Sequence, residues 1–285
     1  MSLPTEAGDL EAFFSSAKSI CVLTGAGVSQ ESGVPTFRGA DGLRFDSAHR
    51  PERQSNGWRK FRAEDLATPE AFARDPLLVW EWYAWRRELI HGAQPNAAHV
   101  ALVELEERIA AQPDGRFALL TQNVDGLHER AGSRNVIRLH GSIWRLRCPR
   151  CETEREDRAV PLDPFPPRCE CSALLRPGVV WFGEPLPERE WAQAAQAAAT
   201  ADLFLVVGTS ALVQPAASLP LIAKQNRARL VEINPDPTPL SDLADCVVRG
   251  KAAEVLGKLG TQSKNCHGGT EAQRKKSGAR SQKPE

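Results

Sequence analysis

Two cysteine pairs in the middle of the chain have the spacing of metal ligands. Cys148 and Cys151 form a C-x-x-C motif, and Cys169 and Cys171 follow as a shorter C-x-C motif. Four thiolates from two such pairs are typical ligands of one structural zinc ion, and they leave no open position for catalysis. A redox-active C-x-x-C is the alternative, but it needs a strand–helix context that the sequence lacks here. We therefore predict one structural zinc ion, with the geometry of the shorter pair left open.

An aromatic segment, WEWYAWRREL at residues 80–89, contains the chain's only tyrosine and two arginines. Helical spacing predicts one buried face on this segment, formed by Leu78, Trp82, Trp85 and Leu89. Tyr83 and Arg86 are three residues apart and would be neighbours on a flanking face. A guanidinium group in this position can bind the anion of a ligand, or it can pair with a nearby carboxylate such as that of Glu81.

A glycine-containing turn, GAGVSQESGVPTFRG at residues 25–39, follows the first apolar run of the chain. Gly25 and Gly27 permit a tight turn and a close approach of the backbone to a phosphate at a helix N-terminus. Gln30 stands where the usual dinucleotide-binding fingerprint has its third glycine. The acidic residue that ordinary dehydrogenases use for the ribose is also missing. The motif indicates nucleotide binding, but it supports a dehydrogenase poorly.

Five short apolar runs predict the strands that must position these residues, at 19–25, 117–123, 136–141, 203–210 and 229–235. They are continuous rather than alternating, as is typical of strands buried on both faces of a parallel sheet. Helical stretches at 99–112 and 216–226 precede two of them. This alternation predicts a doubly wound, Rossmann-like α/β fold, in which ligands bind at the carboxyl ends of the strands.

Two regions interrupt the alternation and are interpreted as insertions that form a smaller domain. The Rossmann-like domain is expected to comprise residues 1–43, 92–144 and 179–260, with a helical insertion at 44–91 that contains no strand. Residues 145–178 are expected to form a zinc-binding insertion. The stretch 261–285 has almost no apolar residues and an excess of basic ones, which predicts a disordered basic tail.

The charge balance, 36 basic against 36 acidic residues, gives no global field for specific nucleic-acid or membrane binding. No run of eighteen apolar residues exists, which argues against a membrane-spanning helix. The first residues resemble neither a secretory signal nor an import peptide, so we expect a cytoplasmic location. We also expect the protein to be a monomer.

Several motifs in unbroken order between residues 10 and 256 carry a family resemblance. They are GAGVSQESGVPTFRG, TQNVDGLHERAG, LHGSIWRLRC, LRPGVVWFGE and VVGTS. Together they resemble the sirtuin (Sir2) family of NAD-dependent protein deacylases, and within it the class III, desuccinylase/demalonylase-type bacterial members. The resemblance implies removal of succinyl, malonyl and acetyl groups from protein lysine side chains, giving nicotinamide and O-acyl-ADP-ribose. A plain deacetylase, and an ADP-ribosyltransferase or NAD hydrolase on the same fold, remain alternatives.

The resemblance also assigns roles to individual residues. His140 corresponds to the family's catalytic base; taken alone, a histidine at a strand end would suit a structural role as well. The residues that correspond to the NAD site are Gly25, Ala26, Gly27, Ser29, Thr36, Phe37, Arg38, Gln122, Asn123, Asp125, Gly208, Thr209, Ser210, Asn234, Asp236 and Ala252. Among them, Asn123 and Asp125 are expected to hold the nicotinamide amide, although TQNVDG alone would also suit a simple turn.

The partner implied by the resemblance is an acylated-lysine protein or peptide. Val180, Trp181, Phe182 and Gly183 correspond to the stretch against which such a peptide adds as a strand. Tyr83 and Arg86 correspond to the Tyr-x-x-Arg pair of family members that prefer acidic acyl groups. Two hydrogen bonds to a charged group, at about 1.5–3 kcal/mol each, could shift acyl preference by roughly a hundredfold or more.

Overall fold

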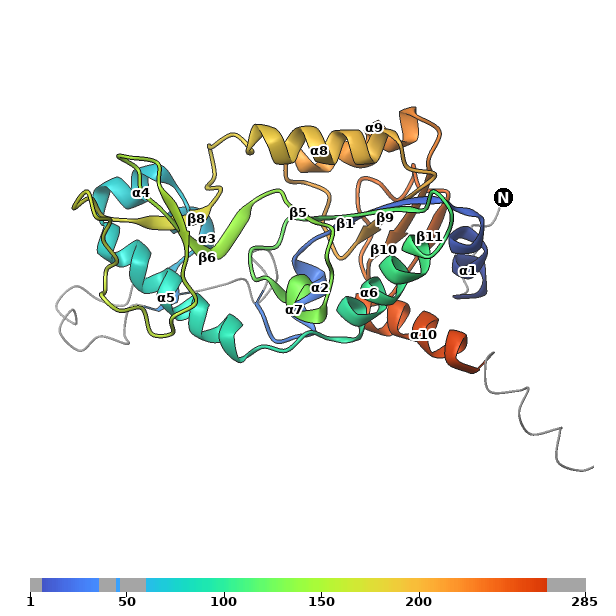
Figure 1. Ribbon diagram of the computed structural model, residues 1–285, viewed down its shortest axis with the longest axis horizontal. Coiled ribbons are helices and arrows are strands. Elements are labelled where there is room, and N and C mark those ends of the chain that lie inside the picture. The colour runs from blue at the N-terminus through green and yellow to red at the C-terminus, as the bar shows by residue number, and fades with distance from the viewer. Residues whose placement is uncertain (1–6, 36–44, 47–59, 266–285) are drawn as a thin grey trace, which may run out of the picture.

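The large domain is a six-stranded parallel sheet between two layers of helices. The computed structural model describes residues 7–35, 45–46 and 60–265 (Figure 1). The strand order is β11-β10-β9-β1-β4-β5. These strands are β1 (Ser19–Thr24), β4 (Arg116–Thr121), β5 (Val136–Arg138), β9 (Leu203–Val207), β10 (Arg229–Ile233) and β11 (Cys246–Val248). The five predicted strands are confirmed, and the short β11 is an addition.

Successive residues of β1 face opposite layers, which explains why the strand is apolar throughout. Ile20 and Val22 pack with α1 (Ala7–Ser16), α6 (Ala97–Ala110) and α10 (Ala252–Asn265). Cys21 and Leu23 pack with α8 (Glu188–Ala199) and α9 (Leu219–Gln225), which continues from the 3-10 helix η3 (Ala216–Ser218). Figure 1 shows these two helical layers on either side of the sheet. The doubly wound fold is therefore confirmed.

The smaller lobe combines the two predicted insertions around one apolar core. Its helices are α3 (Ala63–Leu66), α4 (Pro69–Arg74) and α5 (Pro76–Gly92). Its antiparallel sheet has the order β7-β6-β8, with β6 at Gly141–Arg147, β7 at Glu154–Glu156 and β8 at Arg176–Val179. Figure 1 shows α4, α5, β6 and β8 together beyond one end of the large sheet.

Local sequence explains where the helices of the small lobe begin. The side chain of Thr68 accepts a hydrogen bond from the backbone N–H of Ala71 at 3.1 Å, and that of Asp75 accepts one from Leu78 at 3.0 Å. A proline follows each cap, at the position where a helix needs no N–H donor.

Two features differ from the sequence-based expectation. The helical insertion contains two short strands, β2 (Phe45–Asp46) and β3 (Lys60–Phe61), which pair antiparallel although no strand was expected there. Two-residue strands are too short to produce a recognisable pattern. Helix α10 continues to Asn265, past the predicted start of the tail at residue 261, and the rest of that tail lies outside the described residues.

The buried face of α5 is wider than the predicted one. Trp82 is buried, and Leu78 and Trp85 pack against the core of the small lobe as predicted, but Leu89 is 36% exposed. The buried residues of α5 are Val79, Trp80, Trp82, Tyr83, Arg86, Arg87 and Ile90. The prediction placed Tyr83 and Arg86 on a flanking face, and the tertiary structure buries both, together with Arg87. Within the described part of the chain, no helix is long and apolar enough to cross a membrane.

Candidate active site

The loops that follow β1 and β9 pack tightly against each other at the carboxyl edge of the large sheet. The backbone N–H of Gly25 donates to Val207 O at 3.1 Å, and that of Gly27 donates to Gly208 O at 2.8 Å. A Cβ atom at Gly25 would lie 2.6 Å from Thr209 Cβ, and one at Gly27 would lie 2.8 Å from Gly208 O. Loop packing by itself therefore requires both glycines, before any phosphate is considered. The short helix α2 (Ala26–Gln30), where Ala26 is half-buried, begins at this contact.

We expect Gly208→Ala to lower the free energy of unfolding by about 1–3 kcal/mol, because overpacking adds to backbone strain. Gly208 has a φ of +59°, and its Cβ would lie 2.7 Å from the backbone nitrogen of Val28. Gly33→Ala is the matched control, because Gly33 has a φ of +82° and open space around it. Chemical denaturation of both variants checks this prediction, and equal losses would show that strain alone, without loop packing, accounts for the effect.

Ser29, Asn123 and Asp125 form a hydrogen-bonded cluster beside this loop contact. Asn123 Nδ2 donates to Gly25 O at 3.0 Å and to Ser29 Oγ at 3.1 Å. Ser29 Oγ donates to Asp125 Oδ2 at 2.8 Å, and the backbone N–H of Leu127 donates to Asp125 Oδ1 at 2.8 Å. The Asp125 side chain is only 4% exposed; burial raises its pKa, although these two hydrogen bonds oppose the rise. The cluster presents an amide and a carboxyl group whose positions are held by several bonds.

The hydrogen bond of His140 defines which ring nitrogen can act as a base. His140 Nδ1 lies 3.0 Å from the carbonyl oxygen of Gln122, which can only accept. Nδ1 therefore carries the hydrogen, and Nε2 of the neutral ring has a free lone pair. Burial lowers the pKa of His140, and the bond to Gln122 only partly offsets it. The imidazole is thus neutral, and able to accept a proton at Nε2, at neutral pH.

Two residues predicted to bind the cofactor, each just after the end of a strand, donate hydrogen bonds to Thr209, which follows a third strand. Gln122 Nε2 donates to Thr209 Oγ1 at 2.9 Å, and Asn234 Nδ2 donates to Thr209 O at 2.9 Å. Ser210 and Asp236 are exposed on the same two loops, after β9 and β10. The other candidates lie elsewhere: Ala252 is buried as the first residue of α10, and Thr36, Phe37 and Arg38 lie outside the described residues.

Tyr83 and Arg86 are both buried on α5, and both belong to the side of the helix that faces the site. Trp181 Nε1 donates to Tyr83 Oη at 2.9 Å, so helix α5 contacts the predicted substrate stretch directly. The Arg86 guanidinium carbon lies 5.0 Å from the Trp82 ring centroid and 6.0 Å from that of Tyr83. Burial lowers the pKa of Arg86, while Tyr83 and Asp125 raise it. Asp125, from the amide-and-carboxyl cluster, is thus electrostatically coupled to Arg86.

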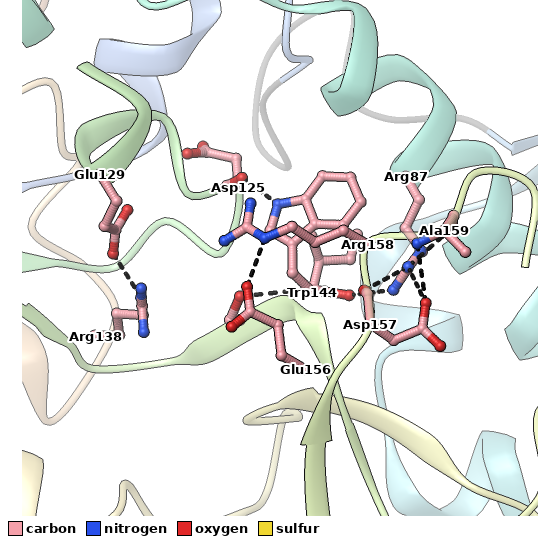
Figure 2. Close-up of polar contacts among 11 residues, drawn as sticks. Arg87, Asp125, Glu129, Arg138, Trp144, Glu156, Asp157, Arg158 and Ala159 are labelled. Carbon is pink, nitrogen blue, oxygen red and sulfur yellow. Dashed lines mark hydrogen bonds and ion pairs between the residues drawn. The ribbon is translucent and has the colours of Figure 1, made fainter. Parts of the chain in front are cut away.

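Arg87, the second arginine of the segment, ties α5 to the zinc-binding insertion. Its guanidinium donates to Ile143 O at 2.9 Å, to Asp157 O at 2.7 Å and to Ala159 O at 3.1 Å. It also lies over the Trp144 ring, at 4.9 Å from the centroid. Trp144 Nε1 in turn donates to Asp125 O at 2.6 Å (Figure 2). Arg87 therefore supports the loop that carries Asp125, a role that spacing along the helix gave no reason to expect.

The predicted substrate stretch is held by a backbone bond to His140 and by an ion pair, Arg176–Glu184, that the sequence analysis did not select. His140 O accepts from the backbone N–H of Val180 at 2.9 Å, which places this stretch beside the candidate base. Arg176 Nη1 and Nη2 donate to the two carboxylate oxygens of Glu184 at 2.5 and 2.9 Å. Phe182 and Gly183, between these anchors, are exposed. The sequence contained one sign of this ion pair: Arg176 and Glu184 are opposite charges at the two ends of an apolar run, RPGVVWFGE.

The four cysteines converge into one cluster whose geometry fits zinc. All four Sγ atoms lie within 4.8 Å of one another, and the pairs Cys148–Cys171 and Cys151–Cys169 are each 3.5 Å apart. A zinc ion with four bonds of about 2.3 Å requires sulfurs about 3.8 Å apart. The prediction of one zinc site is confirmed, and the donors present are the four thiols that a closed, structural site uses.

The shorter C-x-C pair folds as a contracted version of the first. Cys148 N donates to Thr153 O at 2.9 Å, and the turn between them has Glu152 at a φ of 61°. Cys169 N donates to Ala173 O at 2.9 Å, with Ser172 at a φ of 71°. Both turns thus close by the same backbone bond, and the second does so with one residue fewer.

Comparisons with known proteins agree with this geometry. Residues 25–215 match the sequence profile of the Sir2 family. The chain is 51% identical over 242 residues to the "NAD-dependent protein deacylase" of Aquifex aeolicus, covering 85% of this chain and 93% of that protein.

Two solved structures extend the likeness to the fold. A Sir2 homologue in complex with NAD is 48% identical, with a TM-score of 0.81, and the match covers 93% of this chain and 97% of that one. A Sir2 protein with a deacetylated peptide and 3′-O-acetyl ADP-ribose is 31% identical, with a TM-score of 0.74, and the match covers 90% and 98%.

Proposed function

The chain belongs to the Sir2 family, and we propose that it removes acidic acyl groups, succinyl and malonyl, as well as acetyl groups from protein lysine side chains. Its general activity is that of an NAD-dependent protein deacylase, with acylated-lysine proteins as substrates. Its preference for acidic acyl groups is the finer proposal, and it is carried by the buried Tyr83 and Arg86 on α5.

In the proposed deacylation, each residue of the site has a separate role. NAD, when bound, supplies the ribose carbon to which the acyl oxygen bonds as nicotinamide leaves. The neutral His140 accepts a proton from a ribose hydroxyl at Nε2, since Nδ1 is committed to Gln122 O. Asn123 and Asp125 are the groups proposed to hold the nicotinamide amide, because Ser29 and Gly25 keep both side chains in fixed positions.

The burial of Arg86 supports recognition of a substrate carboxylate. Its side chain is only 5% exposed, and a guanidinium loses most of its hydration there. A carboxylate at the end of an acyl chain can accept charge-assisted hydrogen bonds in a geometry that a guanidinium matches well.

We expect Arg86→Met to lower kcat/KM for a succinyl-lysine peptide by roughly a hundredfold, because the variant loses about two hydrogen bonds to a charged group. Turnover of the acetyl-lysine form of the same peptide should fall far less. Arg74→Met, at an exposed arginine of α4 in the same lobe, is the matched control and should change neither rate. The measurement is product formation by mass spectrometry, with and without NAD.

Two results would contradict the acidic-acyl proposal. Turnover of acetyl-lysine alone, indifferent to Arg86, would make the protein a plain deacetylase. Release of nicotinamide at the full rate without any peptide would favour an NAD hydrolase on the same fold, because simple NAD cleavage has no use for an acyl pocket.

A further inference from the structure

The hydrogen bond between Trp181 and Tyr83 has a defined direction. An indole N–H can only donate, so Tyr83 Oη is the acceptor in this 2.9 Å contact. Both side chains are buried, with 3% and 1% of their surface exposed, so water does not compete for the bond. Among the residues that the structure describes, Trp181 is the hydroxyl's recorded partner. The phenolic hydrogen is therefore directed elsewhere and can be donated to a ligand.

The phenol keeps that hydrogen over the working pH range. Burial raises the pKa of Tyr83 to about 12, although the Arg86 charge and the Trp181 bond act in the opposite direction. Tyr83 and Arg86 thus place a neutral hydroxyl donor and a charged guanidinium donor near each other, with the guanidinium carbon 6.0 Å from the phenol ring centroid. Such a pair suits an anionic group and offers nothing to a methyl group.

Trp181 is itself contacted by a partly buried ion pair, Arg176–Glu184. The Arg176 guanidinium carbon lies 3.4 Å from the centroid of the Trp181 ring. Glu184 Oε2 accepts from the backbone N–H of Trp181 at 2.8 Å and from Arg176 Nη2 at 2.9 Å. Arg176 Nη2 also donates to Val179 O at 2.9 Å. The three side chains form a closed cycle that leaves the indole little freedom to rotate.

The ion pair remains charged despite its burial. Burial by itself raises the pKa of Glu184, but the hydrogen bonds from Arg176 and from the Trp181 backbone outweigh it and lower that pKa overall. The cycle is therefore intact at neutral pH, and the indole N–H stays directed at Tyr83.

We propose that Trp181 is a positioning residue that makes the Tyr83 hydroxyl a hydrogen-bond donor to the carboxylate of an acidic acyl group, and that Arg176 and Glu184 hold Trp181 in the required orientation. This inference rests on the proposed acidic-acyl function and names a further residue that determines it. Without the indole N–H, the orientation of the hydroxyl is no longer fixed before the substrate binds, and donation to the carboxylate then costs additional ordering. Acetyl-lysine has no carboxylate and is indifferent to that change.

The test is a double-mutant cycle of Trp181→Phe and Tyr83→Phe, measured as the ratio of kcat/KM for succinyl-lysine to that for acetyl-lysine on one peptide. Phenylalanine at 181 keeps an aromatic face for Arg176, and it removes the N–H donor together with part of the buried indole volume. We expect Trp181→Phe to lower this ratio about fivefold or more, mainly through the KM of the succinyl substrate. In the Tyr83→Phe background the same change should leave the ratio unaltered, because the hydroxyl on which Trp181 acts is gone.

Arg86→Met, assayed alongside, separates the two proposals. A ratio that falls in Arg86→Met but not in Trp181→Phe overturns the role of Trp181 and leaves the acidic-acyl function standing. An equal fall for Trp181→Phe in both backgrounds also overturns it, since the effect would then not pass through Tyr83. A ratio unaffected by Arg86→Met overturns the acidic-acyl function, and the present inference with it.

A measurement on the unmutated enzyme guards against misfolded variants. Because Tyr83 is the only tyrosine of the chain, labelling with 3-fluorotyrosine gives a single fluorine resonance. A succinyl-lysine peptide should shift this resonance and an acetyl-lysine peptide should not, each relative to the peptide-free enzyme. Equal responses to both peptides would contradict a donor role for the Tyr83 hydroxyl.

Discussion

Replacing His140 with alanine is expected to reduce kcat by about 10²–10⁴-fold, because the deacylation loses its proposed proton acceptor, whose ring is held by Gln122 O. The variant should still bind NAD, since the glycine turn and the Asn123–Asp125 cluster form without the imidazole. Initial rates with an acetyl-lysine peptide, together with an NAD titration by calorimetry, test both parts. Loss of NAD binding along with activity would instead indicate that His140 supports the fold of the site.

The pH dependence of the unmutated enzyme follows from the same residue. Burial lowers the pKa of His140, so the folded enzyme holds the neutral, basic form to a lower pH than a free histidine, whose pKa is about 6.5. Activity is therefore expected to be full at neutral pH and to decline only as the pH falls through this lowered pKa. An acid limb of kcat/KM above about 6.5 would contradict the assignment.

Loss of zinc is expected to cause the largest loss of stability. Cys148 is fully buried at the end of β6, and its side chain belongs to the apolar core of the small lobe. Structural zinc in small peptides has an apparent binding free energy of about 10–16 kcal/mol. Even a third of that, about 4 kcal/mol, would lower Tm by roughly 8–16 °C in a chain of this size. Cys148→Ser and chelation of the wild type should both produce this shift.

Activity should fall with the metal, although zinc takes no part in the chemistry. Arg87 and Trp144 connect the zinc-binding insertion to the loop of Asp125, so a disordered insertion releases that loop. Cys266→Ser, at a cysteine outside both motifs, is the control and should keep full zinc content and Tm. Metal content by atomic absorption and thermal unfolding by calorimetry are the measurements. A metal-free Cys148→Ser protein with an unchanged Tm would rule out a structural role for the ion.

The local sequence pattern was sufficient to predict those features that depend only on residues close together in the chain. The five predicted strands were recognisable because a parallel sheet buries both faces, so runs such as 203–210 are apolar throughout. The zinc site was recognisable because two short knuckles specify their own turns, even when one lacks a residue. His140 and the Asn123–Asp125 loop were recognisable because they follow the ends of predicted strands. The fold brings such strand ends together at one edge of the sheet.

Pattern failed where partners lie far apart in the sequence. The predicted buried face of α5 was too narrow because charge normally marks the surface, and only the packing of α5 on β6 reveals carbonyl partners for Arg87 at Ile143 and Ala159. The roles of Arg176 and Glu184 were missed for a similar reason, since an ion pair is not visible until the chain turns between its members.

The sequence by itself determined the Rossmann-like sheet, the ligand set for zinc and the identity of the groups that can do chemistry. These depend on residue type and short spacing, which any chain of this sequence carries before it folds. The tertiary structure alone decided which nitrogen of His140 is left to act as a base, that Arg86 is buried, and that the Tyr83 hydroxyl accepts a hydrogen bond from Trp181. Each of these is set by one hydrogen bond or one packed face between residues distant in sequence, and only the folded chain brings such residues within reach.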